Sequence, residues 1–138
     1  MPTLDDAHDI AALRLAAADD DLTALPAPLQ TVLLLTSAQG LLDNGGLHAF
    51  FGAEFPGRPP YGLFVAAYER IGAAAEARGL ARAVAVFPFD EPHLDAQRRA
   101  AWLAEHVQAF ADGDVLCGSE AVWPLLEAYV TRHADAFA

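Results

Sequence analysis

Aspartate and glutamate side chains carry most of the chemistry that this sequence offers. Nineteen of them occur, and twelve of these fall in three groups along the chain. Carboxylates three or four residues apart on a helix lie about 5–6 Å from one another, so a rigid helix can present them as a row of negative charge. Such a row suits a surface that binds a basic protein, and the alternative is an acidic surface that contacts only solvent. The groups are Asp5, Asp6, Asp9, Asp19, Asp20 and Asp21; Asp90, Glu91 and Asp95; and Asp112, Asp114 and Glu120.

The balance of charge narrows the kind of partner. The formal net charge is -11, and all eight basic residues are arginines, without a single lysine. Direct binding to nucleic acid is disfavoured, because phosphates require a basic face. An anionic membrane surface is disfavoured for the same reason. The electrostatically favoured partners are basic proteins, including those that bind DNA.

The remaining reactive side chains do not form a pattern that is typical of catalysis or metal binding. The histidines are not paired at a metal-ligand spacing, and no cysteine cluster completes a tetrahedral set. A phosphate-binding loop would need a lysine after its glycines, and Cys117 has no adjacent base. We therefore predict a non-enzymatic protein without a metal or a cofactor. The histidines are His8, His48, His93, His106 and His133.

The single cysteine excludes an intrachain disulfide and fits a reducing compartment. The first residues are acidic and lack the apolar segment of a signal peptide. The apolar run Val32–Leu35 is too short to span a membrane. From these features we predict a cytoplasmic protein.

Apolar periodicity predicts an all-α fold in a single domain, residues 1–138, with about six helices. Residues 1–25 are expected to form an acidic N-terminal helix and linker, with Leu13 on the buried side, and residues 26–137 to form the core. The helix over about 28–43 is apolar on several sides, which is typical of a buried central helix. Further helices are expected over 5–18, 47–53, 61–78, 80–87, 95–111, and from 119 or 123 to 136. For residues 80–87 a short strand is the alternative.

A corner follows the central helix. Asn44, Gly45 and Gly46 are expected to end that helix, because Asn and Gly accept the left-handed conformation. Phe50 and Phe51 come directly after the corner. A ligand site with Asn44, His48 and the two phenylalanines as its walls is one interpretation, and a structural turn is the other.

The order of several short motifs resembles a known family. The motifs are Asn44-Gly45-Gly46 followed by Phe50-Phe51, and then the stretches 69–73, 86–88 and 125–130. They are similar to a family of small all-helical bacterial proteins, formerly catalogued as a domain of unknown function. That family takes its name from a DNA-mimic protein that binds a transcription factor and displaces it from DNA. The chain departs from the pattern at Leu47, where the family has an aromatic residue, and at Ala49, where it has a glutamine.

The resemblance implies an acidic module that occupies the basic surface of a DNA-binding protein or transcription factor and so regulates transcription. It makes the corner residues mainly structural and assigns binding to the exposed acids. The residues alone leave other functions open: a small-ligand or enzyme site at the corner, or an antidote or structural partner in a bacterial gene pair. A homodimer also stays open.

Overall fold

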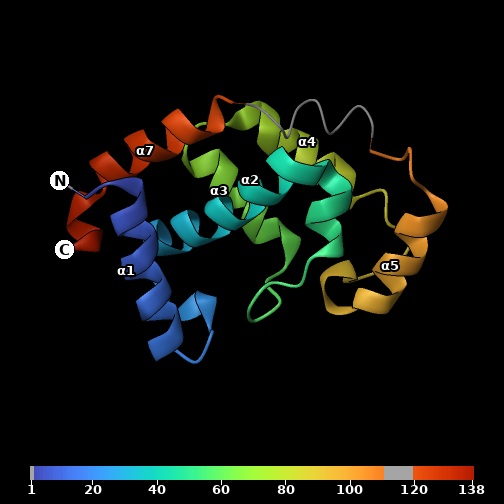
Figure 1. The fold of residues 1–138 in the computed structure, drawn as a ribbon, viewed down its shortest axis with the longest axis horizontal. Coiled ribbons are helices and arrows are strands. Elements are labelled where there is room, and N and C mark those ends of the chain that lie inside the picture. Colours follow the sequence, from blue (N-terminus) through green and yellow to red (C-terminus); the bar gives the residue numbers. More distant parts are fainter. Residues whose placement is uncertain (1, 111–119) are drawn as a thin grey trace.

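The computed structural model of the protein describes residues 2–110 and 120–138, and every regular element in them is helical (Figure 1). This confirms the predicted all-α fold with about six helices, and the alternative strand near residue 85 is absent from the described chain. One apolar core joins the α-helices that the structure describes. The α-helices are α1 Leu4–Ala17, α2 Ala27–Gly52, α3 Tyr61–Arg70, α4 Ala74–Val84, α5 Ala96–Glu105 and α7 Val122–Arg132, with the 3-10 turns η1 Leu22–Ala24, η2 Pro92–Leu94 and η3 Ala134–Phe137.

Helix α2 is the centre of the fold, as its sequence predicts. It contacts α1, α3, α5 and α7, and Figure 1 shows it running between them. Leu29, Val32 and Leu35 have no exposed surface. A fully buried aliphatic side chain stabilises a fold by about 1.5–3 kcal/mol, so this helix supplies much of the driving force for folding.

The corner lies where the sequence places it, but only one residue makes the turn. Gly46 has φ 67° and ψ -161°, which divides α2 into two helical segments. The expected helix end at Asn44 is therefore wrong, because Asn44 and Gly45 stay helical. Gly45 is required for a different reason: a Cβ there would lie 2.7 Å from the Cβ of Ala49. The second segment ends at Gly52 and matches the short helix predicted over 47–53.

The single helix predicted over 61–78 is in fact two helices. Helix α3 ends at Arg70, and α4 begins at Ala74 and continues through Gly79 to Val84. The break is at Gly72, which has φ 88°. Apolar spacing did not reveal the break, because Ile71 and Ala73 on either side of it are also buried.

Two predicted helices are too long, and one predicted buried side is wrong. Helix α5 ends at Glu105 rather than near residue 111, and Val107 beyond it is 64% exposed. Helix α7 ends at Arg132, and its Pro124 lies in the first turn as expected. Leu13 of α1 is 73% exposed, because Ala7 and Ala11 face the core instead.

Candidate protein-binding surface

The predicted acidic residues lie on the surface. All of those that the structure describes are exposed, whereas Asp112 and Asp114 lie outside the described residues. Exposure alone does not make a site, so the arrangement of the carboxylates decides what they can bind. The exposed residues are Asp5, Asp6, Asp9, Asp19, Asp20, Asp21, Asp90, Glu91, Asp95 and Glu120.

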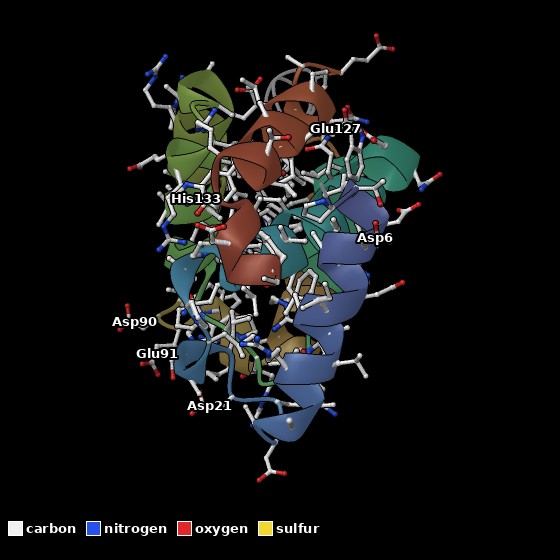
Figure 2. All side chains as sticks on the ribbon, turned by 90° about the vertical axis from the view of Figure 1, so that its left-hand side faces the viewer. Asp6, Asp21, Asp90, Glu91, Glu127 and His133 are labelled. Atoms are coloured by element: carbon white, nitrogen blue, oxygen red, sulfur yellow. The ribbon has the colours of Figure 1, made fainter. Side chains whose placement is uncertain are left out.

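The fold separates the N-terminal acids, which the sequence groups together. Helix α1 has 14 residues, about 21 Å at 1.5 Å per residue. Asp5, Asp6 and Asp9 lie on its first turns, whereas Asp19–Asp21 follow its last turn. Figure 2 shows Asp6 and Asp21 toward opposite ends of α1. The six residues therefore form two groups rather than one cluster.

The fold also brings together acids that are distant in sequence. The turn after α2 connects them, because Gly57 packs against the backbone carbonyl of Asp20, while Arg58 donates a hydrogen bond from Nη1 to the Leu94 carbonyl at 3.5 Å. Figure 2 shows Asp21 on one side of this turn, and Asp90 and Glu91 on the other, toward the lower part of the molecule. We call this group the acidic edge: Asp19, Asp20, Asp21, Asp90, Glu91 and Asp95.

The backbone of the acidic edge is unusually constrained. Among the described residues, the non-glycine residues with positive φ are Asp19 (55°), Asp20 (62°), Arg58 (45°) and Glu91 (51°). All of them belong to the edge or to the turn that joins its two halves. Left-handed backbone costs a non-glycine residue roughly 1–2 kcal/mol and is least unfavourable for Asp and Asn. The surrounding contacts therefore hold this part of the surface in a defined shape.

Three of the acids have a local structural role. Asp6 and Thr3 form a reciprocal capping box at the start of α1, and hydrogen bonds from the Thr3 backbone and side chain lower the pKa of Asp6. Asp21 accepts from the Thr23 amide at 3.1 Å, and Asp95 caps α5 through the Arg98 amide at 3.0 Å. Asn can replace Asp in such caps, so these charges can be removed without removing the caps.

Arginines do not neutralise the acidic edge in the part of the chain that the structure describes. The ion pairs there are His8–Asp9, at 3.8 Å, and Arg99–Glu54, at 2.6 Å. Arg58 and Arg98 are the arginines beside the edge, and neither forms an ion pair with its acids among the described residues. Residues 61–84, by contrast, carry three arginines against two glutamates. The negative charge of the edge is therefore available to a partner.

Arg99 positions half of the acidic edge, and the sequence reading missed it. Its side chain is 2% exposed. It donates from Nε to the Phe51 carbonyl at 2.8 Å, from Nη1 to the Pro92 carbonyl at 2.7 Å, and from Nη2 to Glu54. It thus fastens η2, and with it the segment 90–95, to the end of α2. An arginine on the apolar side of a predicted helix was the available signal.

A second missed group joins three helices at the middle of α2. Asp43 accepts from Trp123 Nε1 of α7 at 2.9 Å and from Gln39 Nε2 at 2.8 Å. Gln39 is buried and accepts from the Tyr68 hydroxyl of α3 at 2.9 Å. The four-residue spacing of Gln39 and Asp43 was visible in the sequence, but the partners on α3 and α7 were not. The group couples α2 to both neighbouring helices.

The corner residues are built into the core. Phe50 and Phe51 have no exposed surface and pack against Tyr61, Phe64 and Phe87 at ring-centroid distances of 4.9–5.6 Å. This packing supports the structural interpretation of the two phenylalanines. Burial raises the pKa of Tyr61 to about 12; the nearby Arg99 charge opposes the rise and Glu54 adds to it.

The polar side chains of the corner are engaged locally. Asn44 donates to the Gly40 carbonyl of its own helix at 2.7 Å. One ring nitrogen of His48 lies 3.3 Å from the His106 carbonyl, and the His48 ring meets the edge of Phe110. These contacts hold the corner against the segment after α5.

Metal-ligand clusters and membrane-spanning helices are not found among the described residues. No group of three or more His, Cys, Asp and Glu side chains there is arranged to hold a metal ion. Likewise, none of the helices in residues 2–110 and 120–138 has the length and apolar character needed to cross a membrane.

Comparison with known protein families gives a match over most of the chain. The family model of the DMP19-like proteins matches residues 23–133, which include α2 through α7 but not α1. No curated protein and no solved structure matches the chain.

Proposed function

The chain belongs to the family of DMP19-like proteins, and on that basis we propose that it is a DNA mimic that binds a DNA-binding protein. In this proposal the acidic edge occupies the basic surface with which the partner would otherwise contact DNA phosphates. The partner is a transcription factor or another DNA-binding protein, and binding regulates transcription in the bacterial cytoplasm. The protein itself performs no reaction.

The observation that carries the proposal is the acidic edge without neutralising arginines. Its six carboxylates correspond to the charge on about 10 Å of DNA, or about three base pairs, at one charge per roughly 1.7 Å. This extent matches the footprint of one DNA-contacting helix or loop, not that of a whole wrapped domain. The constrained backbone supports the same function, because a fixed array of charges loses less entropy on binding than a flexible one.

The first experiment identifies the partner. The protein is immobilised, proteins from the native host are bound at low salt and eluted by rising salt, and the retained DNA-binding proteins are purified. Each purified DNA-binding protein is then bound to its own DNA site, and the free protein is added to see whether it displaces the DNA. We expect displacement of the DNA and weakening of the protein complex with salt, because exposed charges are screened.

Matched charge variants then test the surface. One variant carries Asp19→Asn, Asp20→Asn, Asp90→Asn and Glu91→Gln at the edge. The control carries Glu69→Gln, Glu76→Gln, Glu127→Gln and Asp135→Asn elsewhere on the molecule. Both change the net charge from -11 to -7. We expect only the edge variant to lose the ability to displace DNA. Equal losses would mean that net charge rather than the edge decides binding, and no loss in either would refute the proposal.

The oligomeric state is part of the same proposal. A homodimer would present two acidic edges to a partner that is itself a dimer on DNA. Sedimentation of the protein alone and with its partner measures the stoichiometry.

A further inference from the structure

An apolar cleft lies between α1, α2 and the turn that follows α2. Helix α1 contributes Ala12 and Leu15, α2 contributes Leu33 and Ser37, and the turn contributes Phe55. His8 and Ser37 are the polar side chains of its lining. The lining is therefore suited to an apolar group.

The size of the cleft favours a side chain as its occupant. Its volume is about 220 Å³, several times the roughly 30 Å³ that one water molecule occupies. It is smaller than the roughly 300–1,000 Å³ of pockets that hold drug-sized ligands and cofactors. One aliphatic or aromatic side chain of a partner fits this range.

The charges around the cleft indicate which protein would supply that side chain. Asp9 follows the lining residue His8 on α1, and it also borders a second, shallow hollow with Ala12 and Leu13. Asp19–Asp21 lie in the short segment between the lining residues Leu15 and Leu22, and the turn that closes the cleft contacts Asp20. Acids thus lie near both ends of the α1 wall, no arginine is among the lining residues, and Arg58, between the lining residues Pro56 and Pro59, is the one arginine of the turn that closes the cleft.

We propose that this cleft binds one apolar side chain carried on a basic segment of the partner. The inference rests on the proposed function and deepens it: the acids attract the segment, and the cleft anchors it. The α1 wall lies outside the part of the chain that the family model matches. The anchor is therefore a feature of this chain that charge mimicry alone does not account for.

A pair of labelled peptides tests the anchor. One peptide has a central leucine with two arginines on either side, and the other has glycine in place of the leucine. Binding is measured by fluorescence anisotropy at about 20 mM and about 200 mM salt. We expect the leucine peptide to bind about tenfold more tightly, in line with burial of one aliphatic side chain. The ratio should persist at both salt concentrations, while both affinities fall with salt.

Variants that fill the cleft show whether the preference comes from it. Ser37 and Ala12 are both exposed on their helices, so Ser37→Phe and Ala12→Phe fill the cleft from two sides with little change to the core. Each should reduce the leucine preference to about one. Ala128→Phe on the exposed side of α7 is the control and should preserve it. Circular dichroism confirms that each variant is folded.

The outcomes separate the two proposals. Equal binding of the two peptides to the unmodified protein, or a preference that survives both filling variants, overturns the anchor but leaves charge mimicry standing. If both peptides bind the edge variant as tightly as the unmodified protein, the mimicry is refuted. The anchor is then judged from the leucine preference alone. A filling variant that converts a dimer to a monomer would assign the cleft to a second copy of the chain and overturn the anchor. Failure of the leucine peptide to bind at low salt would overturn the anchor, and displacement of DNA by the free protein would still decide the mimicry.

Discussion

Replacing Arg99 should destabilise the protein far more than replacing its neighbour Arg98. Arg99 is buried and donates to the backbone carbonyls of Phe51, Pro92 and, at 3.4 Å, Ala53, and to Glu54. Arg98 is exposed, and its guanidinium lies 4.6 Å from the centre of the Phe89 ring. Arg99→Met and Arg98→Met remove the same charge from the same helix and introduce the same side chain. Any difference between them therefore reports the contacts of the buried guanidinium.

The contacts set the size of the effect. Methionine would leave the carbonyls of Phe51 and Pro92 without their donors, at roughly 1–3 kcal/mol for each that stays buried. The pair with Glu54 adds less than about 1 kcal/mol, because that carboxylate is half exposed to water. We expect a loss of about 3 kcal/mol in the free energy of unfolding, which lowers Tm by about 10 °C for a domain of this size. The cation–π contact of Arg98 is worth only about 0.5–1 kcal/mol.

Urea denaturation followed by circular dichroism gives the unfolding free energy and the slope m for each variant. Arg99→Lys keeps the charge but cannot reproduce the forked geometry, so it should recover only part of the loss. The same variants should weaken partner binding, since Arg99 holds the segment 90–95 in place. Arg99→Met and Arg98→Met agreeing within about 0.5 kcal/mol would refute the positioning role of Arg99.

Three further changes test other contacts. Gly57→Ala should lower the free energy of unfolding by about 1–3 kcal/mol, because Gly57 has φ 75° and a Cβ there would lie 2.5 Å from the Asp20 carbonyl oxygen. Gly62→Ala is the control: Gly62 lies in open space on α3, so the change should raise the free energy of unfolding by about 0.5–1 kcal/mol. Thermal unfolding of both variants measures the difference. Arg58→Asn removes an arginine beside the acidic edge and suits its φ of 45°. It loses only the long 3.5 Å hydrogen bond to the Leu94 carbonyl, so partner binding measured by titration should tighten at low salt with at most a small loss of Tm, and weaker binding would contradict the assigned edge. Because the folded-state pKa of Tyr61 is raised to about 12, the folded protein holds its proton longer than the unfolded chain, and the unfolding free energy should fall as the pH rises from about 10 to about 12; Tyr61→Phe should remove that slope in urea titrations.

The sequence predicted the parts of the fold that depend on apolar content. The central helix was recognisable because Leu29–Leu42 is apolar on several sides, and only a helix surrounded by others can bury all of them. Helix ends were harder. Gly46 and Gly72 both have positive φ, yet Gly79 and Gly45 are helical. Nothing in the local sequence separates these glycines, because the tertiary packing selects which one turns.

The candidate site shows a different limit. The sequence identified the acids of the edge but grouped them by their order in the chain, which placed Asp5 and Asp21 together. The turn at Gly57 and the guanidinium of Arg99 regroup them, and neither contact leaves a periodic signal. A binding surface of this kind depends on loops held by a few long-range hydrogen bonds, so composition can indicate its charge but not its shape.

The same contacts explain why charge and shape belong together at the edge. Six carboxylates without neutralising arginines repel one another, and this repulsion opposes the compact state. In a flexible loop they would move apart, and a partner would have to order them on binding. Here the Gly57–Asp20 contact and the Arg99 hydrogen bonds oppose that separation, so part of the ordering cost is met when the chain folds. Weakening either contact should therefore slow or weaken partner binding even where every acid is retained.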